Sequence, residues 1–91
     1  VEIDRKRFLV KRDKEESPLT MRELRLLEVF MEKPNEVLSR DYLLNAVWGV
    51  DYLGTTRTLD QHIAQLRKKV ESVDAPQLIV TVHGVGYRYN P

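Results

Sequence analysis

The sequence has 91 residues, 42% of them hydrophobic, with a formal net charge of +1 and no cysteine. This length fits one small domain with a single core, and the lack of cysteine excludes disulfide bonds and thiolate metal sites. No apolar run approaches the roughly 18–20 residues that cross a bilayer, so we expect no membrane-spanning segment in these residues.

The basic residues are slightly concentrated toward the C-terminus. Residues 55–91 contain five arginines and lysines against three acidic residues, whereas the rest of the chain is net acidic. This bias is weaker than the basic patch of many nucleic-acid binders, so charge is only a supporting observation for such a function. The chain does not begin with methionine, and we expect it to be a fragment of a longer protein.

Residues 1–19 are predicted to form short antiparallel strands. Residues 1–4 alternate between apolar and polar side chains, and residues 8–10 form an apolar stretch that fits a core. Residues 13–16, Asp-Lys-Glu-Glu, are typical of a turn. The segment therefore predicts a meander of two or three strands.

A first helix is predicted over residues 20–33. Thr20 and Glu23 form a capping box, in which the threonine hydroxyl accepts a backbone N–H bond and the glutamate reaches back to the cap. The apolar side chains of the helix are Leu24, Leu26, Leu27, Phe30 and Met31. They span an arc of about 160°, which is wide for one buried stripe. We expect packing on two sides, against the N-terminal strands and later helices, and an end before Pro34.

A second helix is predicted over residues 39–48, with Ser39 as its N-cap and Asp41 near the positive end of its dipole. Its apolar face consists of Leu43, Leu44 and Val47, and Gly49 ends it. Residues 49–54 are too many for a tight turn of about 3–4 residues between two helices. We expect this segment to be an exposed excursion.

A third helix is predicted over residues 55–72, capped by Thr55 or Thr56. Leu59, Ile63, Leu66 and Val70 recur at helical spacing and make one narrow apolar stripe. When this stripe lies inward, the opposite face is polar. That face carries Arg57, Gln61, Ala64, Gln65 and Lys68, flanked by Thr58, His62 and Lys69 on one side and by Asp60 and Arg67 on the other.

The polar face of this third helix fits the major groove of duplex DNA. Its cations and the helix N-terminus can hold phosphates, and a glutamine amide can pair with the N6/N7 edge of adenine. A polar outer face is also the ordinary surface of a solvated helix. The helix alone therefore leaves both interpretations open.

A C-terminal hairpin is predicted over residues 78–90. Residues 78–82 are rich in β-forming side chains, and residues 87–89 alternate as a returning strand. Residues 83–86 form the connecting loop, whose two glycines, Gly84 and Gly86, allow a tight tip. The result is a helix trio followed by a hairpin.

Several aromatic and basic side chains near these elements have two interpretations. His83 beside the hairpin tip could enter a minor groove, and Arg88 or Tyr87 could reach a phosphate. Alternatively, the tyrosines lie in the core and the histidine is merely exposed. Trp48 fits the edge of the core, where its N–H could also donate to a phosphate.

The sequence predicts neither an enzyme nor a cofactor. No serine lies in a nucleophile elbow, and residues 84–86 lack the third glycine and the following helix of a dinucleotide-binding loop. His62 and His83 have no carboxylate or cysteine at ligand spacing, so we expect no metal site.

Four segments in this order resemble the OmpR/PhoB-type output domain of bacterial transcriptional response regulators. They are the capped first helix, residues 39–49, residues 57–69 with the run Arg-Thr-Leu-Asp-Gln-His-Ile, and residues 81–88 with the run Gly-Val-Gly-Tyr-Arg. The resemblance covers residues 19–89. It implies an α+β winged helix-turn-helix fold: a short N-terminal antiparallel sheet, three helices and a C-terminal β-hairpin wing. The third helix would enter the major groove and the wing the adjacent minor groove, and residues 1–18 look one strand short of the family's sheet.

By position, the resemblance implies phosphate contacts for Trp48, Arg57, His62, Arg67 and Tyr87, and base contacts around Gln65. With the residue-based argument, the predicted DNA-contact set is Trp48, Arg57, Thr58, Gln61, His62, Gln65, Arg67, Lys68, Lys69, Thr81, His83, Tyr87 and Arg88. Many family members carry arginine where this chain has His83 and Gln65. These departures weaken the expected wing insertion at neutral pH and favour an A·T pair at the glutamine.

The resemblance also implies partners. A phospho-acceptor receiver domain would precede this segment in the full-length protein, and phosphorylation there would promote a homodimer on tandem half-sites of double-stranded DNA. Residues 49–54 resemble the loop that contacts RNA polymerase in the family, with Tyr52 and Leu53 as candidate contacts; a plain connector is the alternative. The implied location is the bacterial cytoplasm, at the nucleoid.

Two other functions stay open at this point. A winged-helix module could use the same polar face to bind only a protein partner, which the modest net charge and the excursion at residues 49–54 would fit. Similar domains also occur in membrane-anchored regulators that have no receiver domain.

Overall fold

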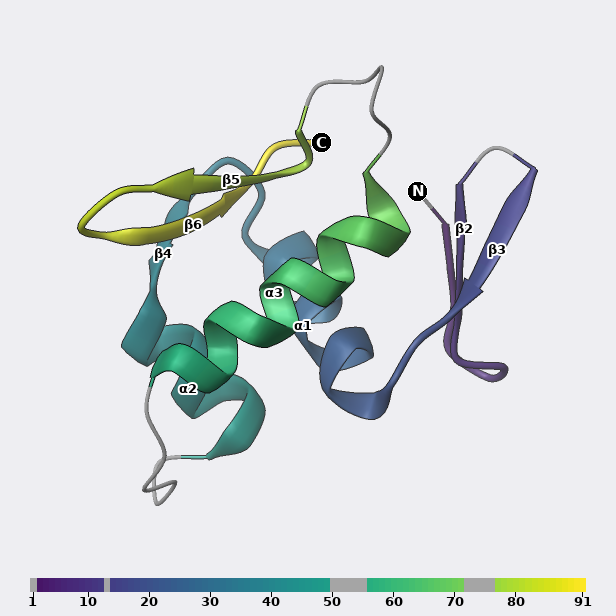
Figure 1. Cartoon of the computed structure of the whole chain (residues 1–91), viewed down its shortest axis with the longest axis horizontal. Coiled ribbons are helices and arrows are strands. Elements are labelled where there is room, and N and C mark those ends of the chain that lie inside the picture. Colours follow the sequence, from purple (N-terminus) through teal and green to yellow (C-terminus); the bar gives the residue numbers. More distant parts are fainter. Residues whose placement is uncertain (1, 13, 50–55, 72–76) are drawn as a thin grey trace.

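The structure, a computed structural model, describes residues 2–12, 14–49, 56–71 and 77–91. Within these residues, three helices are joined to two antiparallel sheets, one before the first helix and one built around the C-terminal hairpin (Figure 1). In chain order the elements are β1 (Glu2–Asp4), β2 (Leu9–Arg12), β3 (Glu15–Pro18), α1 (Met21–Glu32), β4 (Val37–Ser39), α2 (Arg40–Trp48), α3 (Thr56–Val70), β5 (Ile79–Val82) and β6 (Gly86–Tyr89). The predicted α+β class is confirmed.

The helices follow the predicted ranges closely. α1 has the predicted capping box: the Thr20 hydroxyl accepts the Glu23 N–H at 3.2 Å, and the Glu23 carboxylate accepts the Thr20 N–H at 2.8 Å. Ser39 is the N-cap of α2, as predicted. α3 lies inside the predicted range 55–72, whose two end residues fall outside the described residues.

β1, β2 and β3 form an antiparallel meander in that order, which confirms the three-strand form of the predicted sheet. The predicted turn at residues 13–16 is wrong in its second half. Glu15 and Glu16 lie in β3, where they pair with Arg12 and Lys11 of β2. Opposite charges that face each other across two strands stabilise the pairing, and Arg12 Nη2 lies 2.9 Å from Glu15 Oε2. Glu15 and Glu16 therefore belong to a strand and not to the turn.

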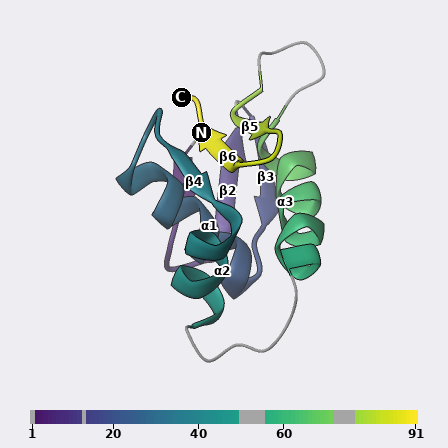
Figure 2. The same cartoon turned by 90° about the vertical axis from the view of Figure 1, so that its left-hand side faces the viewer.

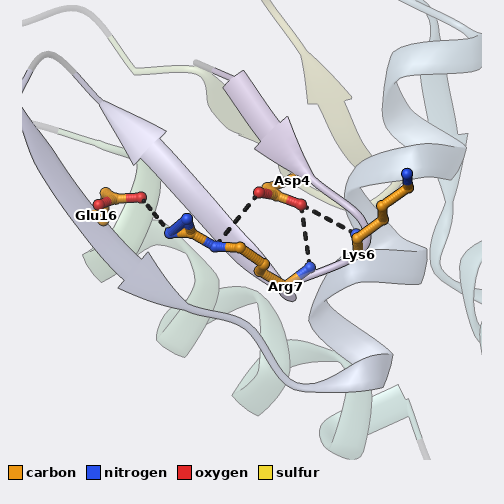
Figure 3. Close-up of polar contacts among 4 residues, drawn as sticks. All are labelled: Asp4, Lys6, Arg7 and Glu16. Atoms are coloured by element: carbon orange, nitrogen blue, oxygen red, sulfur yellow. Dashed lines mark hydrogen bonds and ion pairs between the residues drawn. The ribbon is translucent and has the colours of Figure 1, made fainter.

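Asp4 organises the turn between β1 and β2 (Figure 3). Its Oδ1 accepts the backbone N–H groups of Lys6 and Arg7, each at 3.0 Å. The Arg7 side chain reaches Glu16 of β3, with Nη2 at 3.1 Å from Oε2. Exposed ion pairs of this kind add little stability each. The attachment of the sheet depends more on β2, which packs against α3 and buries Val10.

The second sheet has the strand order β4-β6-β5 and contains one strand that the sequence did not predict. β4 lies between α1 and α2 and pairs antiparallel with β6, so that Leu38 faces Tyr87. A strand of three residues carries too short a pattern to be recognised locally, and its partner comes much later in the chain. The β5–β6 hairpin, called the wing below, lies inside the predicted range 78–90.

The two glycines of the wing have different roles. Gly84 has a φ of +78°, which suits the tight tip that the sequence predicts. Gly86 lies at the start of β6, where an added Cβ would collide with the carbonyl oxygen of Leu38 in β4. Gly86 is therefore required for the close approach of two strands and not for the tip.

The helices share one core, in which Leu26 and Phe30 of α1 and Leu43 of α2 have no exposed surface. α1 packs against α2, α3 and β6, which confirms the half of the prediction that concerned later helices. The expected packing of α1 against the N-terminal strands is not among its main contacts, because that sheet packs through β2 on α3. Met31 was expected in the buried arc but is 38% exposed. It lies in the last turn of α1, at the rim of the core, and Val29 is buried instead.

α3 lies at the surface between the two sheets. In Figure 1 it crosses the front of the molecule, with the wing on one side and the N-terminal sheet on the other. Figure 2 shows α1 and α2 on the other side of the molecule from α3. Among the described residues, no helix has the length and apolar character needed to span a membrane.

Candidate nucleic-acid interface

The apolar stripe of α3 points inward. Leu59, Ile63 and Leu66 have no exposed surface, and Val70 is 1% exposed. The opposite face, called the outward face below, is open to solvent as predicted and carries Arg57, Gln61, Ala64, Gln65 and Lys68. It therefore presents cations near its two ends, amides between them and no acid, a pattern that suits a DNA groove.

Trp48, at the end of α2, contacts one flank of α3. Its ring meets the His62 ring edge-on, with centroids 4.9 Å apart. The Arg22 guanidinium lies 5.3 Å from the centre of the same tryptophan ring, and its Nη1 donates to the carbonyl of Val47 at 2.6 Å. Trp48 is half-buried at the core edge, as predicted, and two side chains hold its ring. Sequence reasoning missed Arg22, because its contacts join residues far apart in the chain.

His62 makes a hydrogen bond within its own helix. Its Nδ1 lies 2.9 Å from the backbone oxygen of Thr58. A carbonyl only accepts hydrogen bonds, so Nδ1 carries the proton. In the neutral ring, Nε2 is then an acceptor. Donation from Nε2 to a phosphate therefore requires the imidazolium form.

The other flank of α3 contacts the wing through Arg67. Its Nε and Nη2 donate to the carbonyl oxygen of Ile79 at 3.0 and 2.8 Å, and Nη2 also donates to the Thr81 hydroxyl at 2.6 Å. The guanidinium lies 5.5 Å from the centre of the Tyr87 ring. Arg67, predicted as a phosphate contact, thus directs these donors into its own domain.

Asp60, on the same flank, joins three elements. The Tyr87 hydroxyl of β6 donates to Asp60 Oδ1 at 2.7 Å, and Arg40 at the start of α2 donates through Nε to the same oxygen at 3.1 Å. Burial alone would raise the pKa of Asp60, but the hydrogen bonds from Arg40 and Tyr87 outweigh it and hold that pKa below its usual value. The carboxylate therefore stays charged, and its stabilising contribution is lost only as the pH falls below the ordinary aspartate pKa of about 4.

Burial and the bond to Asp60 act on Tyr87 in the opposite direction. Burial, followed by the hydrogen bond to the carboxylate, raises the pKa of Tyr87 to about 12. The phenol is therefore neutral at physiological pH, and its hydroxyl donates a hydrogen bond to the charged Asp60 carboxylate. The predicted phosphate contact at this residue would have to compete with that bond. Sequence reasoning did not single out Arg40, whose partner Asp60 is 20 positions away.

Lys69 is also engaged within the domain. Its Nζ lies 2.7 Å from Oε1 of Glu23, the capping-box glutamate of α1, whose side chain is 3% exposed. A nearly buried carboxylate needs such a partner, because an unpaired buried charge is costly. Lys68, the next residue, is exposed on the outward face.

The tip of the wing is open to solvent. His83, Gly84 and Val85 are exposed, with Val85 at 53%. A cleft of about 300 Å³ lies between this tip and the first turns of α2 and α3, and its lining includes His83, Arg40 and Asp60. Imidazole, unlike guanidinium, is not permanently charged. The wing therefore offers a weaker cation at its tip than an arginine would.

The structure divides the predicted contact residues into three groups. The exposed ones are Arg57, Gln61, Gln65, Lys68 and His83. The half-buried residues on the flank and wing are Trp48, Thr58, His62 and Arg88. Those with polar atoms bonded to other parts of the domain are Arg67, Lys69, Thr81 and Tyr87. Tyr52 and Leu53 lie outside the described residues, and within the described ones no three potential ligand side chains cluster as a metal site.

The profile of a family described as "Transcriptional regulatory protein, C terminal" matches residues 14–89. A probable transcriptional regulatory protein of Picosynechococcus is 50% identical over 76 residues, which are 82% of this chain and 30% of that protein. The transcriptional regulatory protein AfsQ1 of Streptomyces coelicolor is 48% identical over 90 residues, which are 98% of this chain and 40% of that protein. The chain thus spans well under half the length of these relatives.

Two solved structures with this fold are complexes of DNA-binding domains. The DNA-binding domain of the response regulator AdeR, in complex with an intercistronic region, has a TM-score of 0.80 and 34% identity, covering 99% of this chain and 94% of that one. The DNA-binding domain of Klebsiella pneumoniae RstA, in complex with the RstA box, has a TM-score of 0.78 and 30% identity, covering 97% and 88%. The likeness extends over nearly the whole domain in both cases.

Proposed function

The chain belongs to the OmpR/PhoB-type family of DNA-binding C-terminal domains of transcriptional regulatory proteins, and from this membership we propose how it binds DNA. α3 lies in the major groove, and the wing tip meets the adjacent minor groove. The observation that carries this proposal is the inward stripe of α3, which leaves its donor-rich outward face uncovered.

In this proposal, some side chains of the outward face contact DNA phosphates and others contact base edges. Arg57 and Lys68, near its two ends, contact backbone phosphates, which fix position without reading sequence. Gln61 and Gln65 face base edges, where an amide pairs with the N6/N7 edge of adenine. Gln65 thus favours an A·T pair. The exposure of all four side chains supports this assignment.

In this proposal, the Trp48 side of α3 and the wing make further contacts to the DNA. Trp48, Thr58 and His62 lie beside the outward face, and the clamped tryptophan ring supports a fixed N–H direction. His83 at the exposed tip meets the minor groove, with Arg88 nearby on β6. To Arg67, Lys69, Thr81 and Tyr87, whose polar atoms already have partners, we assign a supporting role.

For the full-length protein we propose a receiver domain, as in a response regulator, and a homodimer on tandem half-sites. The support is that the match covers only 30–40% of the length of two similar regulatory proteins. The segment 49–54, with Tyr52 and Leu53, is the proposed contact for RNA polymerase and lies outside the described residues. The proposed location is the cytoplasm, at the nucleoid.

The test selects preferred duplexes from a random pool and titrates the best one at about 50 and about 200 mM salt. Each neutralised phosphate contributes roughly −0.9 to the slope of log K against log salt, so several contacts give a steep loss of affinity. Absent binding at low salt, or binding that salt does not weaken, contradicts the proposal. A protein partner that binds the outward face while no duplex does would favour the protein-binding module instead.

A further inference from the structure

We propose that Asp60 and Arg67 brace the wing against α3 and set the angle at which the wing meets the duplex. Both are then positioning residues, and their DNA effects pass through the wing. The inference rests on the proposed function, since the angle matters only if α3 and the wing bind one duplex together. The observation behind it is that these two side chains, on one flank of α3, are hydrogen-bonded to two different strands, β6 and β5.

The two residues lie on the same side of α3. They are seven positions apart, close to two full turns of an α-helix. Asp60 holds β6 through the Tyr87 hydroxyl at 2.7 Å. Arg67 holds β5 through two bonds to the Ile79 carbonyl and one to Thr81. With a single hydrogen bond the wing could rotate about that contact. Hydrogen bonds to both strands restrict this rotation.

Tyr87 connects the two halves of the brace. Its hydroxyl binds Asp60, its ring lies under the Arg67 guanidinium at 5.5 Å, and the residue is 7% exposed. Arg40 holds the Asp60 carboxylate from the start of α2. The carboxylate is therefore the point at which α2, α3 and the wing meet.

The same contacts attach both edges of the second sheet to the helices, through Asp60 and Arg40 at one edge and through Arg67 at the other. β4 forms one edge, and α2 follows it directly in the chain. β5 forms the other edge. Just before β5, the Leu78 carbonyl accepts the Asn90 N–H at 2.6 Å. Because successive carbonyls of an extended chain point in opposite directions, the carbonyl of Ile79 faces away from β6. Such a group on an edge strand has no ladder partner, and Arg67 occupies it.

A small tilt at this edge has a large effect at the tip. β5 has four residues, which at about 3.3 Å per residue make a lever of about 13 Å. A tilt of about 10° at its base then moves the tip by about 2 Å. This displacement exceeds the tolerance of a hydrogen bond, so loss of the brace is expected to take the tip out of its groove.

The test footprints a selected duplex with the wild-type protein and with Tyr87→Phe, Thr81→Val and Arg67→Lys. None of the three changes the net charge. Hydroxyl radicals report on the minor groove under the wing, and methylation of guanine N7 reports on the major groove at α3. We expect each variant to lose minor-groove protection, to keep major-groove protection, and to bind roughly fivefold more weakly, as for one lost hydrogen bond.

Two control variants separate positioning from general stability. Val70→Ala removes core volume at the end of α3 without touching the brace, and Tyr42→Phe removes a tyrosine hydroxyl from an exposed residue of α2. Both should keep the wild-type footprint at a temperature where circular dichroism shows every variant folded.

The possible failures are distinguishable. Wild-type minor-groove protection in Tyr87→Phe, Thr81→Val and Arg67→Lys overturns the brace. An equal loss of protection in Val70→Ala overturns it too, because the effect then follows stability. A wild-type protein that protects neither groove contradicts the proposed function instead.

Discussion

Arg57 and Arg67 lie on the same helix and have the same chemistry, yet the fold places them in different environments. Arg57 is exposed on the outward face, whereas Arg67 is half-buried and directs three hydrogen bonds into the wing. The difference comes from their neighbours, because the wing covers one flank of α3, whereas the outward face is covered by none of the elements that the structure describes. A cation on a helix thus identifies a DNA contact only once the elements beside that helix are known.

The comparison depends first on the orientation of α3, which Leu66→Ala tests with the largest expected effect. Leu66 has no exposed surface, so truncation should lower the free energy of unfolding by about 2–5 kcal/mol. Urea unfolding followed by circular dichroism measures this loss. Gln65→Ala, one residue earlier and exposed, should change it by less than about 0.5 kcal/mol. A loss below about 1 kcal/mol for Leu66→Ala would mean that the stripe is not the buried face.

The wing-side flank should have an alkaline transition that the outward face lacks. Because the pKa of Tyr87 is raised to about 12, the folded state favours the protonated phenol. Its contribution is present below the ordinary tyrosine pKa of about 10 and is lost as the pH rises to about 12. The upper limit is about 2.7 kcal/mol for two pKa units.

Urea unfolding between about pH 9 and 12 measures this loss. Tyr87→Phe should flatten the alkaline decline in unfolding free energy, and Tyr42→Phe, at an exposed tyrosine, should leave it in place. Identical declines in the wild type and in Tyr87→Phe would show that the hydroxyl of Tyr87 does not contribute.

Salt dependence sharpens the contrast between the two arginines. Arg57→Ala should weaken duplex binding about tenfold, as expected for one charge-assisted hydrogen bond, and reduce the salt slope by about 0.9. Arg67→Ala should reduce the slope by less than Arg57→Ala does, because the Arg67 guanidinium is bonded to the wing. Lys14→Ala, on the exposed N-terminal side, serves as the charge-matched control. A reduction of about 0.9 for Arg67→Ala as well would favour a direct phosphate contact there.

The smallest expected effect concerns the wing tip. His83→Arg should strengthen duplex binding on the order of fivefold at neutral pH, because a permanently charged planar donor replaces an imidazole. Affinity measured by fluorescence anisotropy checks this, with His83→Gln as an uncharged comparison. Equal affinities for the wild type and both variants would show that residue 83 does not meet the DNA.

Local signals in the sequence predicted most of the framework. The capping box at Thr20 and Glu23, the cap at Ser39 and the stripe of α3 depend on residues within one or two turns, and the structure confirms each. β4 was not predicted because it has three residues and its partner strand, β6, begins 47 positions after the end of β4, at Gly86 against Ser39. The acidic run at Glu15 was misread for the same reason, since its partners lie on another strand.

The sequence by itself determined which residues of α3 lie inside and which lie outside, because helical periodicity relates each side chain to the core through a fixed angle. Only the tertiary structure decided what the outside residues contact. The partners of Arg67, Lys69 and Asp60 come from the wing, from α1 and from α2. No periodicity links such distant positions, so the difference between a solvent-exposed cation and one that is bonded to the wing appears only when the chain is folded.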